Sequence, residues 1–244
     1  MYKKITHSIQ EEHFDHPMVL PLAVAARAGN SAIAIPTPTP PGLIAPLPPA
    51  VMTEYTMTFR MDSRTIWTRY ALGMINYSVS DFGNLPGTPN VKNSMARNAS
   101  TVGTFFTPYY GITAGTKIGE LLTALLVNGE KVVEVIKSGK DDVAVYTGIW
   151  EKQCMSLAEY LNELNPTQYP TTLLFDSFIN LTAAWVRDFK ARFAGDFAAD
   201  AVALDDIVKI GVTGIPDHLQ AGYTSIADML SRGIVAQFPL SFVR

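Results

Sequence analysis

The sequence is poor in cysteine, histidine and charge, and each shortage excludes a class of protein. A single cysteine, Cys154, excludes an intramolecular disulfide framework and a cysteine-based zinc cluster. The 19 basic and 22 acidic residues give a net charge of −3, whereas an electrostatic nucleic-acid binder shows a basic excess. The most apolar early stretch, residues 17–35, is interrupted by Pro21, Arg27 and Gly29, so we expect no membrane span. No apolar segment directly follows the two lysines near the start, so we expect no cleaved secretory signal.

A proline-rich apolar arm, residues 1–55, precedes the rest of the chain. Between Pro17 and Thr53 the only charged residue is Arg27, and nine of the 16 prolines fall in this interval. Proline fixes φ and lacks an N–H donor, so the composition favours extended chain over helix. A disordered linker is one interpretation, although disordered segments are normally charged and poor in aliphatic residues. We expect an arm that binds neighbouring subunits through seven aliphatic residues: Val19, Leu20, Ile33, Ile35, Leu43, Ile44 and Leu47.

Residues 56–244 show the apolar periodicity of helices and predict one all-α domain. Helix breakers such as Asn165-Pro166 and Gly195 separate the periodic segments. Several helices of ~20 residues with short connections favour an up-and-down bundle of four long helices plus shorter ones. Trp67, Trp150 and Trp185 are expected in its core. The predicted helices run over residues 57–80, 88–107, 113–136, 143–164, 171–194, 196–210 and 217–237.

No constellation of residues in the sequence indicates a reaction. The segment His13-Phe14-Asp15-His16 offers ligands of the kind that zinc or iron uses, but it lies outside the predicted core that would fix their geometry. The predicted helices carry no Glu-x-x-His pair of the di-iron type. Cys154 fits a small core residue, and Gly111–Lys117 lacks the spacing of a phosphate loop. We predict no catalytic residue, no metal site and no cofactor.

Six short motifs and one tryptophan resemble those of a known family. Together, over residues 60–239, they resemble an uncharacterised all-helical bundle family of bacteria and large DNA viruses, which implies the fold and no activity. Family members have histidines where this chain has Arg64 and Leu125, and near Gln220 and Gly222. The resemblance implies that any metal or reaction served by those histidines is lost here. The tryptophan is Trp150, and the motifs are Ile66-Trp67-Thr68-Arg69, Pro108-Tyr109-Tyr110-Gly111, Ala114-Gly115-x-Lys117, Asn165-Pro166, Asp196-x-Ala198-Ala199-Asp200 and Ala227-Asp228-Met229-Leu230-Ser231-x-Gly233-Ile234-x-x-Gln237-Phe238-Pro239.

Two functions follow as hypotheses. The first is a non-enzymatic structural subunit of a large assembly, specifically a minor or cement capsid protein of a large virus. Its partners would be other capsid subunits, its location would be the virion, and it would bind no nucleic acid. The alternative is a cytoplasmic bundle of bacterial type that binds a small molecule or a metal and is an enzyme in some cases. Five polar residues are candidates for that second function: Asp62, Arg64, Asn98, Asp176 and Asp228.

Overall fold

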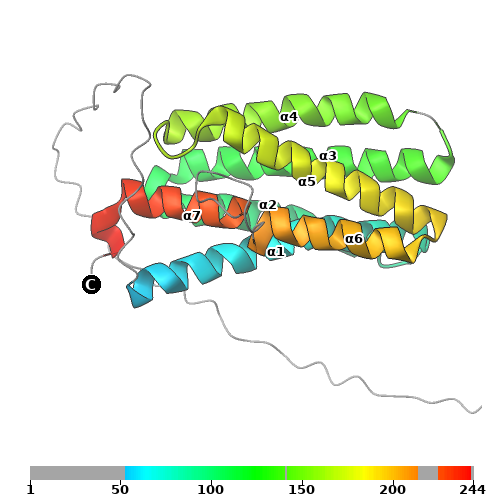
Figure 1. The fold of residues 1–244 in the computed structure, drawn as a ribbon, viewed down its shortest axis with the longest axis horizontal. Coiled ribbons are helices and arrows are strands. Elements are labelled where there is room, and N and C mark those ends of the chain that lie inside the picture. Colours follow the sequence, from blue (N-terminus) through cyan, green and yellow to red (C-terminus); the bar gives the residue numbers. More distant parts are fainter. Residues whose placement is uncertain (1–52, 141, 214–224, 243–244) are drawn as a thin grey trace, which may run out of the picture. The chain divides into compact units, whose positions relative to one another are not determined.

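The computed structural model describes residues 53–140, 142–213 and 225–242, and it confirms the all-α bundle (Figure 1). Five of its helices are 22 to 29 residues long and two are 12 residues long. The part of the chain described here contains no strand. The elements are α1 (Glu54–Phe82), α2 (Thr88–Tyr110), α3 (Ile112–Ser138), α4 (Val143–Leu164), α5 (Thr171–Ala194), α6 (Phe197–Val208), the π-helix η1 (Lys209–Thr213), α7 (Ile226–Gln237) and the 3-10 helix η2 (Pro239–Phe242).

Side-chain caps and glycines set the helix ends. Thr53, Asp196 and Ser225 each precede a helix, and each side-chain oxygen accepts a hydrogen bond from the backbone N–H three residues later. Such caps satisfy N–H groups that have no partner within the helix. Gly139 and Gly195 end α3 and α5 with φ of 67° and 73°, in the left-handed region that glycine adopts without strain.

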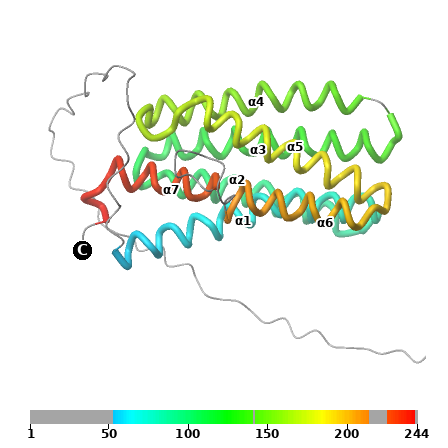
Figure 2. Tube along the Cα trace, in the orientation of Figure 1, coloured from blue at the N-terminus to red at the C-terminus, as the bar shows by residue number. Residues whose placement is uncertain are grey.

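From α1 to α6, each helix packs against the next one in the chain (Figure 2). At the centre lie Trp67, Trp150 and Trp185, at most 1% exposed, which confirms that they belong to the core. The Trp150 Nε1 donates to the Leu125 carbonyl at 2.8 Å, and the Trp185 Nε1 donates to the Ala71 carbonyl at 3.1 Å. These bonds satisfy the indole N–H groups of Trp150 and Trp185, and they hold α4 to α3 and α5 to α1.

The tightest helix crossing joins α2 to α3. A Cβ on Gly103 would collide with the Gly115 carbonyl oxygen and lie 2.9 Å from the Gly119 nitrogen. Glycine at position 103 therefore allows the two backbones to approach so closely. The predicted bounds of α2 and α3 agree with the structure to within a few residues.

Three details differ from the sequence-based prediction. The first helix begins at Glu54, so the last residues assigned to the arm are helical. Residues 211–213 of the predicted break belong instead to the π-helix η1, which packs on α1 and α7, and residues 214–216 of it lie outside the described residues. Within the predicted helix 217–237, α7 begins at Ile226, because Ser225 is extended and caps it, and residues 217–224 lie outside the described residues. The rest of the arm, residues 1–52, lies outside the described residues.

Candidate functional site

Two arginines of α1 surround one buried carboxylate of α7. The Arg64 Nε lies 3.2 Å from the Asp228 Oδ1, and its Nη2 lies 2.9 Å from Oδ2, a bidentate pair. The Arg60 Nη2 lies 3.2 Å from the same Oδ1. The Asp228 side chain is 1% exposed, against 19% for Arg60 and 43% for Arg64. This α1–α7 cluster joins residues more than 160 positions apart in the chain.

Local structure on both helices positions the cluster. Arg60 and Arg64 are four residues apart, so they share one face of α1. Between them, the buried Ser63 donates to the Ala227 carbonyl at 3.0 Å and fixes how α7 sits on α1. Asp228 lies in the first turn of α7, where the helix dipole favours a negative charge. The carboxylate is therefore held by opposite charge and by its place in the helix.

The cluster brings together only two of the five candidates for small-molecule or metal binding, Arg64 and Asp228. Asn98 lies elsewhere, with its Nδ2 donating to the Arg69 carbonyl at 3.0 Å, and Asp62 and Asp176 are exposed on α1 and α5. A carboxylate that already accepts three hydrogen bonds from guanidinium groups has little capacity left for a metal or a substrate proton. The geometry therefore fits an ion-pair cluster that holds α7 against α1.

Residues from three of the resembling motifs meet around Asn165. The Asn165 Nδ2 donates to the Gly233 carbonyl at 3.1 Å and to the Tyr110 hydroxyl at 3.3 Å. The Tyr110 hydroxyl in turn donates to the Gln237 Oε1 at 2.6 Å. This network ties the end of α2 and the α4–α5 loop to α7. These motif residues therefore position helices, an architectural role.

The closing motif also contains a glycine that packing requires. The Tyr169 hydroxyl donates to the Leu230 carbonyl at 2.6 Å, and a Cβ on Gly233 would collide with the Tyr169 ring. At two positions where the resembling family has histidine, Arg64 is in the α1–α7 cluster and Leu125 is a core residue, 2% exposed. Gln220 and Gly222 lie outside the described residues.

A partly apolar groove runs between α3 and α4. Its lining includes Val127, which is 50% exposed, and Ile149, which is 39% exposed. Beside them, the Gln153 Oε1 is buried and accepts no hydrogen bond from any described residue. The sequence analysis missed this groove. Its signal is the wide apolar face of α3, which extends beyond what the neighbouring helices cover.

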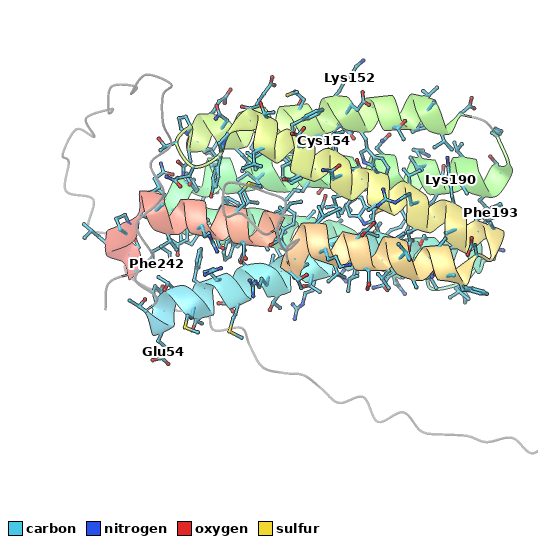
Figure 3. All side chains as sticks on the ribbon, viewed as in Figure 1. Glu54, Lys152, Cys154, Lys190, Phe193 and Phe242 are labelled. Carbon is cyan, nitrogen blue, oxygen red and sulfur yellow. The ribbon has the colours of Figure 1, made fainter. Side chains whose placement is uncertain are left out.

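Cys154 is a buried core residue in the described part of the chain. Figure 3 places Cys154 on α4, where it is fully buried, and burial raises the pKa of its thiol to about 12. This confirms its interpretation as a core residue. All four histidines and the seven candidate residues of the arm lie outside the described residues. Among the described residues, no three His, Cys, Asp or Glu side chains gather where they could hold a metal ion.

The comparisons with known proteins give no relative. No protein-family model matches the chain, and neither a curated protein nor a solved structure matches it significantly. Within residues 53–140, 142–213 and 225–242, no helix combines the length and apolar character needed to cross a bilayer.

Proposed function

We propose that this chain is a non-enzymatic structural subunit of a large protein assembly, and specifically a minor or cement protein of a viral capsid. One observation carries the proposal: residues 17–53 contain a single charge, nine prolines and many aliphatic side chains. Water solvates such a segment poorly, whereas a partner surface covers the aliphatic groups. Prolines reduce the conformational entropy that the segment loses on binding.

The bundle supports the proposal because it gives the arm a firm attachment. The first turns of α1 pack in an aromatic group with the end of the chain: the Phe59 ring centroid lies 4.9 Å from that of Phe242 and 4.6 Å from that of Phe105. Thr53, the N-cap of α1, donates to the Phe242 carbonyl at 3.4 Å. Figure 3 shows Glu54 and Phe242 at the same end of the bundle. Residue 53 and the first turns of α1 are therefore held against the bundle by these contacts.

Deletion of residues 1–52 tests the proposal. The variant keeps Thr53 and all of α1, so we expect a folded helical bundle by circular dichroism and thermal unfolding. In the native source, we expect its incorporation into the particle to fall at least tenfold relative to the full chain, as measured by quantitative mass spectrometry of purified particles. Incorporation at the full-chain level would contradict the proposal.

A matched pair of full-length variants separates apolar contact from mere length. Replacing Ile33, Ile35 and Ile44 by Asn removes aliphatic surface, whereas replacing Ser31, Thr37 and Thr39 by Asn does not. We expect the first variant to lose incorporation and the second to keep it. Equal incorporation of both would show that the arm does not act through its aliphatic residues. A stoichiometric metal or small molecule in the purified chain would favour the alternative function.

A further inference from the structure

A second charged cluster lies between α5 and α6, and it has the opposite composition to the α1–α7 cluster. The Arg192 Nη2 lies 3.0 Å from the Asp188 Oδ1 and 2.7 Å from the Asp200 Oδ1. One guanidinium nitrogen therefore serves two carboxylates. The Asp188 side chain is fully buried, and those of Asp200 and Arg192 are 14% and 21% exposed. We call these three residues the α5–α6 cluster.

Two buried atoms of the cluster have no hydrogen-bond partner among the described residues. They are the Asp188 Oδ2 and the Arg192 Nε. If both aspartates are ionised, the cluster carries a net charge of −1, with one carboxylate oxygen buried and unpaired. Such an atom is costly, because neither water nor a donor replaces its lost solvation. A proton on the Asp188 Oδ2 removes the net charge and converts the unpaired acceptor into a donor.

The position of each aspartate decides which one holds the proton. Asp200 lies in the first turn of α6, where the helix dipole favours a carboxylate, and it keeps some access to water. Asp188 lies inside the apolar stripe of α5, between buried Trp185 and Phe189. Burial is the largest cause that raises the pKa of Asp188, to about 6. The Asp200 carboxyl raises it further, and the Arg192 guanidinium opposes this.

We propose that Asp188 and Asp200 share one proton under mildly acidic conditions, and that loss of this proton weakens the attachment of α6 to α5. In the protonated state the Asp188 hydroxyl donates to the Asp200 carboxylate while Arg192 remains bonded to both residues. Deprotonation leaves two carboxylates converging on a single guanidinium nitrogen. Repulsion between them acts on the first turn of α6, because Asp200 is part of that turn. The contact between α5 and α6 at this cluster is therefore sensitive to pH.

Carboxyl ¹³C NMR of the full chain tests whether the proton is shared. We expect one aspartate signal to titrate near pH 6 and to disappear in Asp188→Asn. In Asp200→Asn we expect the same signal to titrate at least one pH unit lower, because the repelling carboxylate has been replaced by an amide that donates. An unchanged midpoint in Asp200→Asn would overturn the shared proton and leave burial as the whole cause. No aspartate titrating above pH 5 would overturn it as well.

Hydrogen exchange of the α6 backbone amides tests the mechanical consequence. After correction for the intrinsic pH dependence of exchange, we expect protection of α6 to fall between pH 5 and pH 7.5. Over this range the limit is roughly tenfold, because pH 5 lies one unit below the folded pKa of about 6, whereas a carboxyl with the ordinary value of 3.8 is already ionised at pH 5. Asp188→Asn should remove this fall, whereas Asp205→Asn, on the same helix at a side chain 75% exposed, should keep it. Equal pH dependence in the wild type and Asp188→Asn would overturn the proposal.

Discussion

The two charged clusters of the bundle differ in how many cations meet each buried carboxylate. In the α1–α7 cluster, Arg60 and Arg64 both bond to Asp228, so the buried carboxylate is compensated by two guanidinium groups. In the α5–α6 cluster, Arg192 is shared by Asp188 and Asp200, and one carboxylate oxygen has no donor among the described residues. Each cluster connects two different helices, and each contains an aspartate whose side chain is at most 1% exposed.

The difference shows that burial alone does not decide the behaviour of a charged group. In the α1–α7 cluster two guanidinium groups hydrogen-bond to one carboxylate. The ionised form of Asp228 is therefore satisfied, and the cluster holds the two helices together. In the α5–α6 cluster one guanidinium group bonds to two carboxylates. The strength of this cluster therefore depends on whether Asp188 carries a proton. The following substitutions test this difference between the two clusters, in order of decreasing expected effect.

Replacing Asp228 by Asn should have the largest effect. The amide leaves Arg60 and Arg64 without their carboxylate, and breaking a buried pair on one side costs about 3–5 kcal/mol. We expect the free energy of unfolding to fall by this amount in urea titrations at pH 7. A decrease in the free energy of unfolding below 1 kcal/mol would show that the arginines find other partners and that the cluster is not needed to hold α1 to α7.

Asp188→Asn should stabilise the bundle at neutral pH. A carboxyl whose pKa is raised on folding favours the folded state below its unfolded pKa and loses this contribution as the pH rises through the folded value. For a rise from 3.8 to about 6, the loss at pH 7 is at most about 3 kcal/mol. We expect Asp188→Asn to be more stable than the wild type at pH 7.5 and similar at pH 4 in urea titrations. A variant less stable than the wild type at pH 7.5 would contradict this reading.

Arg64→Gln should have a moderate effect that does not depend on pH. Asp228 keeps its bond to Arg60, and the Arg64 side chain is already 43% exposed, so water compensates part of the loss. We expect a destabilisation of about 1–2 kcal/mol, the usual range for one hydrogen bond to a charged group. The difference from the wild type should be the same at pH 5 and pH 8. A strong pH dependence would place this cluster in the same class as the α5–α6 cluster.

Asp206→Asn provides the smallest expected effect. Asp206 pairs with Arg187 at 2.8 Å, between the same two helices as the α5–α6 cluster, but both side chains are more than a third exposed. Exposed ion pairs contribute little, so we expect a change within about 0.5 kcal/mol at either pH. A larger change would mean that location between α5 and α6, and not burial, explains the effect of Asp188.

Most of the fold could be predicted from the sequence because helix periodicity and helix breakers are local signals. Asn165-Pro166 ends α4 and Gly195 ends α5 as predicted. The π-helix η1 could not be predicted, because Gly211 and its neighbours suggest a break until their burial against α1 and α7 is known. The start of α7 at Ile226 was missed although Ser225 is a good N-cap residue.

The charged clusters were less predictable because each one joins residues of two different helices. Arg64 and Asp228 were candidates from the sequence, but nothing local shows that they meet. Asp188 was not singled out, although a signal exists: it follows Leu181 and Trp185 at helical spacing, so a charged residue falls in an apolar stripe. Its partner Asp200 belongs to the next helix and becomes apparent only when α5 and α6 are packed together.

The central claim, that the arm binds neighbouring subunits, is tested most directly by trypsin. Between Lys4 and Arg60 the only cleavage site is Arg27, which lies among the aliphatic residues of the arm. Cleavage after Arg27 should be at least tenfold slower in the native assembly than in the purified full chain, with cleavage of a denatured sample as the reference. Equal cleavage rates in the assembly and in the purified chain would contradict the claim.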